Sequence, residues 1–239
     1  MTKVAKKQSN AVATFQVPEG YDVGIQREDV KIPSIILWQK ISDLPEFEGE
    51  NVRAGMFVNP VTGDIYDKGT FEGAVIKYYT TARIYGEVDS NTGRKEVKRY
   101  SRDGVHWDDG TLIQPREFQF TEDGSHALKS YHYLVLIKGM EMPAMITFKG
   151  ASAKFAKSLN ANLMYMRPAW RCWFKFSSAV EEKNGNKYHI IQAKAQPKSV
   201  LDQENASLCF DLYESLTEST VSSPEMEKTS DFDGDKVEF

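Results

Sequence analysis

Hydrophobic and polar residues alternate along several stretches of the chain, and this pattern predicts a mainly β protein. Residues 73–85, 130–138 and 142–149 are rich in β-branched and aromatic side chains and are flanked by turn residues. Residues 168–177 and 187–196 continue the pattern on either side of an Asn-Gly turn. We therefore expect five main strands, in the order in which these segments occur.

One segment between the strands changes to a helical period. Phe155, Leu159 and Met166 recur at helical spacing within residues 152–166, and Pro168 ends the segment. Three strands, a helix and two strands follow one another in an oligonucleotide/oligosaccharide-binding (OB) fold, a five-stranded Greek-key barrel with its helix between strands 3 and 4. A generic α+β sheet has the same order of elements. The OB fold, mainly β with one helix, is our expectation.

Composition divides the chain into three parts. Residues 1–20 lack hydrophobic periodicity, so we expect a disordered N-terminal arm. Residues 21–213 form the predicted domain, which carries an N-terminal extension and a polar insertion at residues 87–127. Pro33 interrupts the apolar run of the extension, so we expect that segment to wrap an edge of the sheet. Residues 214–239 are predicted to form a disordered acidic tail.

The net charge of −4 conceals an uneven distribution. Residues 138–200 contain eleven lysines and arginines and three glutamates, whereas residues 214–239 contain eight acids and two lysines. A basic segment followed by an acidic terminus suggests a polyanionic ligand. A solvated basic face with an ordinary tail would have the same composition, so charge alone does not identify that ligand.

Residues 170–176 are predicted to form a strand with two unlike sides. One side is apolar, and the other carries Arg171, Trp173 and Lys175. Cations that neutralise phosphates and rings on which bases stack characterise surfaces that bind single-stranded nucleic acids. Lysine and arginine stems that lie over a partly buried ring would produce the same pattern.

Residues 77–85 and the adjoining loop repeat this mixture of cations and aromatic rings. We expect the cations to contact phosphates and the rings to stack on bases of single-stranded DNA. The predicted DNA-binding residues are Lys77, Tyr79, Arg83, Tyr85, Arg99, Tyr100, Trp107, Arg171, Trp173 and Lys175.

Signals for catalysis, metals and cofactors are weak. The four histidines are scattered, Cys172 and Cys209 lack metal-ligand spacing, and no Gly-x-x-x-x-Gly-Lys-Ser/Thr motif is present. We therefore expect no catalytic residue, no metal and no cofactor. Asp108 and Asp109 could hold a metal for nuclease chemistry, although a solvated turn is the simpler interpretation. No apolar run reaches the roughly 18–20 residues of a membrane span, and the N-terminus has no apolar signal-peptide stretch.

Three features of the chain resemble bacteriophage single-stranded DNA-binding proteins of the OB-fold type. They are the entry pattern at residues 27–33 with residues 54–59 and 62–64 downstream, the strand at residues 131–136 that leads to a Lys-rich helix, and the acidic tail that ends in Phe239. The resemblance implies sequence-independent coating of single strands during phage DNA replication or recombination, in the cytoplasm of the bacterial host. It leaves the oligomeric state open, and a homo-oligomer is one possibility.

The tail combines acids with aromatic rings, which suits a disordered peptide that recruits replication or recombination proteins. The predicted partner-binding residues are Asp231, Phe232, Asp233, Asp235, Glu238 and Phe239. Two other functions stay open at this point. The domain could bind a protein instead of DNA, or it could be a metal-dependent nuclease or recombination enzyme.

Overall fold

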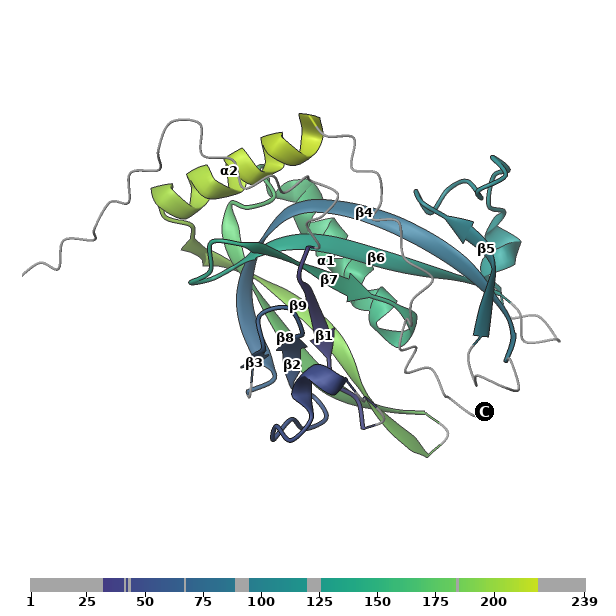
Figure 1. The fold of residues 1–239 in the computed structure, drawn as a ribbon. Helices are drawn as coiled ribbons and strands as arrows, with labels where there is room; N and C mark the ends of the chain where they lie inside the picture. The colour runs from purple at the N-terminus through teal and green to yellow at the C-terminus, as the bar shows by residue number, and fades with distance from the viewer. Residues whose placement is uncertain are drawn as a thin grey trace, which may run out of the picture. The chain divides into compact units, whose positions relative to one another are not determined.

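A computed structural model of the protein describes residues 32–40, 42, 44–66, 68–88, 95–119, 126–183 and 185–218. This part of the chain forms a large mixed sheet with two α-helices (Figure 1). The strands are β1 (Ser34–Leu37), β2 (Phe57–Asn59), β3 (Asp64–Tyr66), β4 (Thr70–Val88), β5 (Lys95–Ser101), β6 (Ala127–Ile137), β7 (Pro143–Phe148), β8 (Cys172–Lys183) and β9 (Asn186–Val200). The helices are α1 (Ala153–Tyr165) and α2 (Gln203–Glu218). The predicted arm at residues 1–20 lies outside the described residues.

The strands follow the order β3-β2-β1-β7-β6-β4-β8-β9, and β5 also pairs with β4. The pair β1–β7 is parallel and the other pairs are antiparallel. No pairing joins β3 to β9 among the described residues, so the sheet is open. The five predicted strands and the predicted helix are confirmed as β4, β6, β7, α1, β8 and β9.

The count of one helix and five strands is wrong, because the extension and the insertion add strands and the helix α2 follows β9. The extension contributes β1, β2 and β3, and the insertion contributes β5. The prediction that the Pro33 segment wraps an edge is also wrong, since β1 lies between β2 and β7. Pro33 precedes the strand, where its missing N–H costs no ladder bond, and its carbonyl accepts a hydrogen bond from Met145 (2.7 Å).

The 19-residue strand β4 organises the sheet, because it pairs with three others. One edge pairs with β6, while the other edge pairs with β8 at residues 70–73 and with β5 at residues 82–88. Gly73 lies where β6 and β8 both flank β4. A Cβ there would approach the Leu136 carbonyl to 3.3 Å and the Phe176 ring to 3.4 Å, so glycine suits this close passage.

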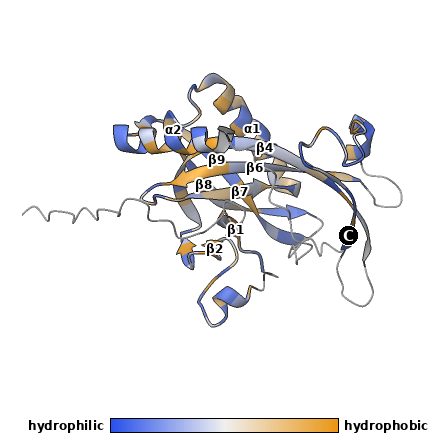
Figure 2. Ribbon diagram, turned by 45° about the horizontal axis from the view of Figure 1, so that its top comes forward, coloured by the Kyte–Doolittle hydropathy of each residue, from blue (hydrophilic) through white to orange (hydrophobic). Residues whose placement is uncertain are grey.

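The two faces of the sheet are covered by different helices. The inner face, which packs against α1, carries the largest core cluster, with Tyr133, Phe148, Phe174 and Phe176 buried together with Leu159 of the helix. We call the opposite side the outer face. Figure 2 shows hydrophobic residues gathered on the central strands of the sheet.

Helix α2 covers part of the outer face, which the sequence analysis did not anticipate. Cys209 of α2 is buried in a second cluster, which also contains Ala74, Ile76, Leu134, Leu136, Trp173 and Leu201. The helix begins after Asp202, whose carboxylate accepts a hydrogen bond from the Asn205 N–H (2.8 Å) as an N-cap. Because α2 runs to Glu218, the tail boundary that we predicted at residue 214 falls inside the helix.

Candidate nucleic-acid interface

A row of polar and aromatic side chains lies on the outer face beyond α2. A β-bulge shifts the register of β4 between Val75 and Lys77, so that Ile76 and Lys77 both lie on the outer face and Val75 on the inner face. Every second residue of β4 then continues along the same face. We define the outer row as Lys77, Tyr79, Thr81 and Arg83 of β4, Tyr100 of β5 and His132 of β6.

The centre of the outer row is rigidly held. The Tyr79 ring stacks on the His132 ring with centroids 4.7 Å apart, and the Tyr79 hydroxyl donates to the Met145 sulfur (3.4 Å). The Thr81 hydroxyl lies 2.9 Å from Nε2 of the His132 ring, and the Thr147 hydroxyl lies 2.9 Å from Nδ1. Burial, and then the nearby Tyr100 hydroxyl, raise the pKa of Tyr79 to about 12. Tyr79 therefore presents an uncharged ring at neutral pH.

A cation and a ring also lie together at the β5 end of the outer row. The Arg83 guanidinium carbon is 5.5 Å from the centroid of the Tyr100 ring, which is within cation–π range. Both side chains are half-buried. Tyr85 is half-buried as well and pairs with Val97 of β5. The structure thus brings four of the ten predicted DNA-binding residues to one face, Lys77, Tyr79, Arg83 and Tyr100, while Tyr85 follows a register shift between β4 and β5.

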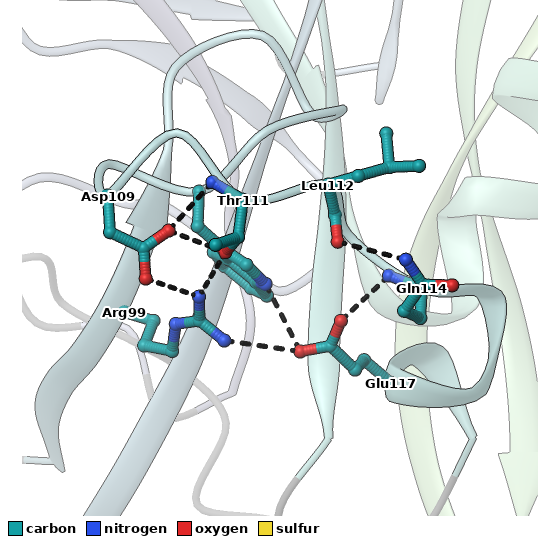
Figure 3. A network of polar contacts seen from close by, with 7 residues as sticks. Arg99, Asp109, Thr111, Leu112, Gln114 and Glu117 are labelled. Atoms are coloured by element: carbon teal, nitrogen blue, oxygen red, sulfur yellow. Dashed lines mark hydrogen bonds and ion pairs between the residues drawn. The ribbon is translucent and has the colours of Figure 1, made fainter.

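Arg99 and Trp107 are instead committed to the packing of the insertion. The Arg99 guanidinium binds Asp109 (2.9 Å), Glu117 (3.4 Å) and the Thr111 hydroxyl (2.8 Å), as Figure 3 shows. It also lies 4.6 Å from the centroid of the Trp107 ring. Trp107 is only 3% exposed, and its indole N–H donates to Glu117 (3.1 Å). The structure therefore buries the Trp107 ring and pairs Arg99 with acids within the insertion, and DNA contact by these two residues stays a prediction.

The same network involves Asp109, which with Asp108 was the alternative candidate for a metal site. The Asp109 carboxylate is bound by Arg99 and by Thr111, and the hydrogen bonds from Thr111, followed by the charge of Arg99, hold the pKa of this carboxyl below its usual value. Within the described residues, no group of three or more histidines, cysteines and acids could hold a metal ion. The arrangement of Asp109 fits a structural role in the insertion.

Glu117→Gln is expected to lower the free energy of unfolding by about 1–3 kcal/mol. The Glu117 carboxylate accepts from three donors, the Arg99 guanidinium, the Trp107 indole and the Gln114 N–H, and the neutral amide weakens all three interactions. Urea unfolding measures the change. Glu96→Gln on the exposed surface of β5 is the matched control. Equal stability of the two variants would contradict the proposed role of Glu117.

Trp173 is buried beneath α2, which contradicts our expectation of an exposed ring. It is 3% exposed and belongs to the cluster that includes Cys209 of the helix. Alternation assigned Trp173 to the correct side of β8, but α2 covers that side. Arg171 and Lys175 remain exposed. Lys175 lies opposite Glu72, and the α2-covered residues Ala74 and Ile76 lie between Glu72 and the outer row along β4.

A second group of charges surrounds Lys175. Lys175 lies opposite Glu72 of β4. Glu72 forms an ion pair with Lys138 (2.5 Å) and accepts a hydrogen bond from Gln196 (2.9 Å). The hydrogen bonds from Lys138 and Gln196 lower the pKa of Glu72. The Lys138 ammonium lies 5.7 Å from the centroid of the Trp173 ring. An acid at the centre of this group makes it a weaker site for phosphate than its lysines alone would suggest.

Sequence reasoning missed His132 and α2. His132 lies between Tyr131 and Tyr133 in a predicted strand, and this alternation was a usable signal for its place on the face opposite the two tyrosines. Asp202, three residues before Asn205 and ahead of an apolar period that includes Cys209 and Leu212, was a usable signal for a capped helix. The predicted tail residues Asp231, Phe232, Asp233, Asp235, Glu238 and Phe239 lie outside the described residues.

Comparison with known proteins gave one match. The model of a family described as Pam3 phage gp34-like protein matches residues 6–222. Neither the curated proteins nor the solved structures gave a match. In the part of the chain that the structure describes, neither helix is long and apolar enough to cross a membrane.

Proposed function

This chain belongs to the Pam3 phage gp34-like protein family, and we propose that this phage protein binds single-stranded DNA without base specificity along its outer row. The proposal depends on one observation: Lys77, Tyr79 and Arg83 share one face of a single strand, with Tyr100 alongside. From Lys77 to Arg83 the strand spans about 20 Å at about 3.3 Å per residue. Cations and rings interleaved over this length suit a backbone with unstacked bases.

The strand pairing supports an OB-like fold for the central part of the chain. β4, β6 and β7 form a meander, α1 follows, β8 returns to pair with β4, and β9 pairs with β8. OB folds bind oligonucleotides on the face of their second and third strands and on the adjoining loops. If β4, β6, β7, β8 and β9 correspond to OB strands 1 to 5, then β6 is the second strand and β5 lies in the loop between strands 1 and 2. The outer row then lies on OB strands 1 and 2 and on that loop.

The N-terminal strand β1 takes the position at which an OB barrel would close. It pairs with β7, and Gln39, just after β1, binds both backbone groups of His189 in β9. The Gln39 amide donates to the His189 carbonyl (2.8 Å), and the His189 N–H donates to the Gln39 side-chain oxygen (3.0 Å). We propose that the domain is an OB barrel opened by one inserted strand.

The remaining parts of the proposal concern partners and place of action. Residues 219–239 contain six acids and two lysines, with phenylalanines at positions 232 and 239. We propose that this tail recruits replication or recombination proteins in the cytoplasm of the host cell. Its acids would also compete with DNA phosphates for the outer row.

Fluorescence anisotropy with labelled oligo-dT and a duplex of equal length tests the proposal. We expect oligo-dT to bind at least about 10-fold more tightly than the duplex, because only unpaired bases can stack on the rings. A chain that ends at Glu218 keeps α2 and is expected to bind oligo-dT more tightly than the full chain. Equal affinity for both DNAs, or no binding at about 50 mM salt, would refute single-strand binding.

One observation favours a protein partner as a second candidate function. An apolar groove of about 340 Å³ runs between β4 and α1 and is lined by Val75, Ile76, Lys77, Tyr78, Asn160, Leu163, Met164 and Ala169. Next to it, Tyr165 is 85% exposed. Exposed apolar surface of this kind suits a protein segment. If the groove serves a protein alone, Met164→Ser with Tyr165→Ser leaves oligo-dT affinity unchanged.

A further inference from the structure

A small polar pocket lies away from the outer row, where four segments of the chain meet. Arg53, Ala54, Gly55 and Met56 come from the connection between β1 and β2, and Lys68 and Gly69 from the turn before β4. Ser178 of β8 and His189 of β9 complete the lining, and the cavity volume is about 250 Å³. We call this site the cationic pocket. Its described lining residues include two cations and no carboxylate.

Two glycines shape the cationic pocket. Gly55 and Gly69 have φ angles of +92° and +59°, which glycine adopts without strain. A Cβ at Gly55 would lie 2.6 Å from the His189 ring, and a Cβ at Gly69 would lie 2.8 Å from the Ser178 hydroxyl oxygen. Only glycine therefore allows the backbone to approach these two polar side chains so closely.

Hydrogen bonds hold the walls of the cationic pocket in place. The Gly55 N–H donates to the Trp38 carbonyl (2.8 Å), and the Ser178 N–H donates to the Gly69 carbonyl (2.9 Å). The backbone of His189 is held on both sides by Gln39. These bonds fix the backbone of Gly55, Gly69, Ser178 and His189 around the pocket.

His189 provides the observation that points to a ligand. Its Nδ1 atom is buried and has no hydrogen-bond partner among the described residues. A buried polar atom without a partner costs stability, so such positions in folded proteins call for an explanation. Burial also lowers the pKa of the His189 ring, which is therefore neutral at pH 7 and offers one N–H donor.

We propose that the cationic pocket binds a phosphate group. Its side chains supply donors suited to an oxyanion: the Arg53 guanidinium, the Lys68 ammonium, the Ser178 hydroxyl and the His189 N–H. Arg53 can bind two oxygens of one phosphate, while Lys68 acts as a point charge. The phosphate could be free in solution or could be the terminal phosphate of a nucleic acid strand. The inference does not depend on DNA binding by the outer row.

Titration with inorganic phosphate, followed by NMR of the His189 ring, tests this inference. We expect saturable binding in about the millimolar range, with a rise in the pKa of His189, since a bound anion favours the imidazolium. Arg53 and Lys68 are the charged groups among the described lining residues. Arg53→Gln and Lys68→Gln should each weaken phosphate binding at least about fivefold.

Lys198→Gln is the matched control, because it removes the same charge from an exposed position of β9 outside the pocket. It should leave phosphate affinity unchanged. The inference fails if the wild-type ring does not respond to phosphate, or if the control loses as much affinity as the two pocket variants. Thermal unfolding confirms that each variant is folded, which is expected because Arg53 and Lys68 are exposed.

Two oligo-dT strands, with and without a 5′-phosphate, distinguish the source of the phosphate. A preference for the phosphorylated strand that Arg53→Gln abolishes assigns the pocket to strand ends. Equal affinity for both strands, with inorganic phosphate still bound, assigns it to free phosphate. If the chain binds no DNA at all, the NMR titration still decides the inference, so the two proposals fail separately.

Discussion

Trp173→Ala is expected to lower the free energy of unfolding by about 3–5 kcal/mol, as other large-to-small core replacements do. The Trp173 side chain is 3% exposed and packs with Ala74, Leu136 and Cys209 between the sheet and α2. The lost ring leaves a cavity that the helix and the strands can only partly fill. Urea unfolding followed by circular dichroism measures the change, which includes loosening of α2.

Lys175→Ala is the control for this substitution, because Lys175 lies two residues further along β8 and is exposed. We expect it to change stability by no more than about 0.5 kcal/mol. Oligo-dT binding by the folded fraction of Trp173→Ala should be close to that of the wild type. A stable Trp173→Ala variant that has lost oligo-dT binding would show that Trp173 contacts DNA directly and would overturn the packing role.

The double variant Lys77→Gln/Arg83→Gln is expected to flatten the salt dependence of oligo-dT binding. Each phosphate contact on a single strand contributes about −0.7 to the slope of log affinity against log salt, so losing two contacts changes the slope by about 1.4. Between about 50 and 200 mM salt, the wild type should therefore lose about sevenfold more affinity than the variant. Anisotropy titrations at four salt concentrations provide both slopes.

Lys175→Gln/Lys194→Gln removes the same charge from two paired positions of β8 and β9 and is the matched control. Both side chains are exposed, and the buried residues Ala74 and Ile76 lie between Glu72, the β4 partner of Lys175, and the outer row. We expect its slope to stay within about 0.3 of the wild type, since no phosphate contact is lost. Equal flattening in both double variants would mean that overall charge, and not the outer row, determines binding.

The elements with a clear local period were predictable from the sequence. The strands that became β6, β7 and β9 and the helix α1 match their predicted segments to within a few residues. Their signals are short-range, because alternation and helical spacing reflect one buried face within a single segment. The short strands β1, β2 and β3 carry three or four residues each, too few for a period to identify them.

The candidate site was predictable in part, for the same reason. Alternation along β4 brought Lys77, Tyr79 and Arg83 to one side, and the sheet register confirms that they share it. Simple alternation would also place Val75 on that side, but the register shift between Val75 and Lys77 leaves Val75 on the inner face. A bulge depends on how two strands pair, and a single strand carries no reliable sign of it.

The sequence by itself determined which residues alternate, where the main strands and α1 lie, and which stretches carry cations and rings. The tertiary structure decided which of those side chains reach the surface. Trp173 is covered by α2, and Arg99 with Trp107 is enclosed by Asp109 and Glu117 of the folded insertion. Burial of a strand face depends on what distant segments pack against it, and alternation within the strand contains no information about those segments.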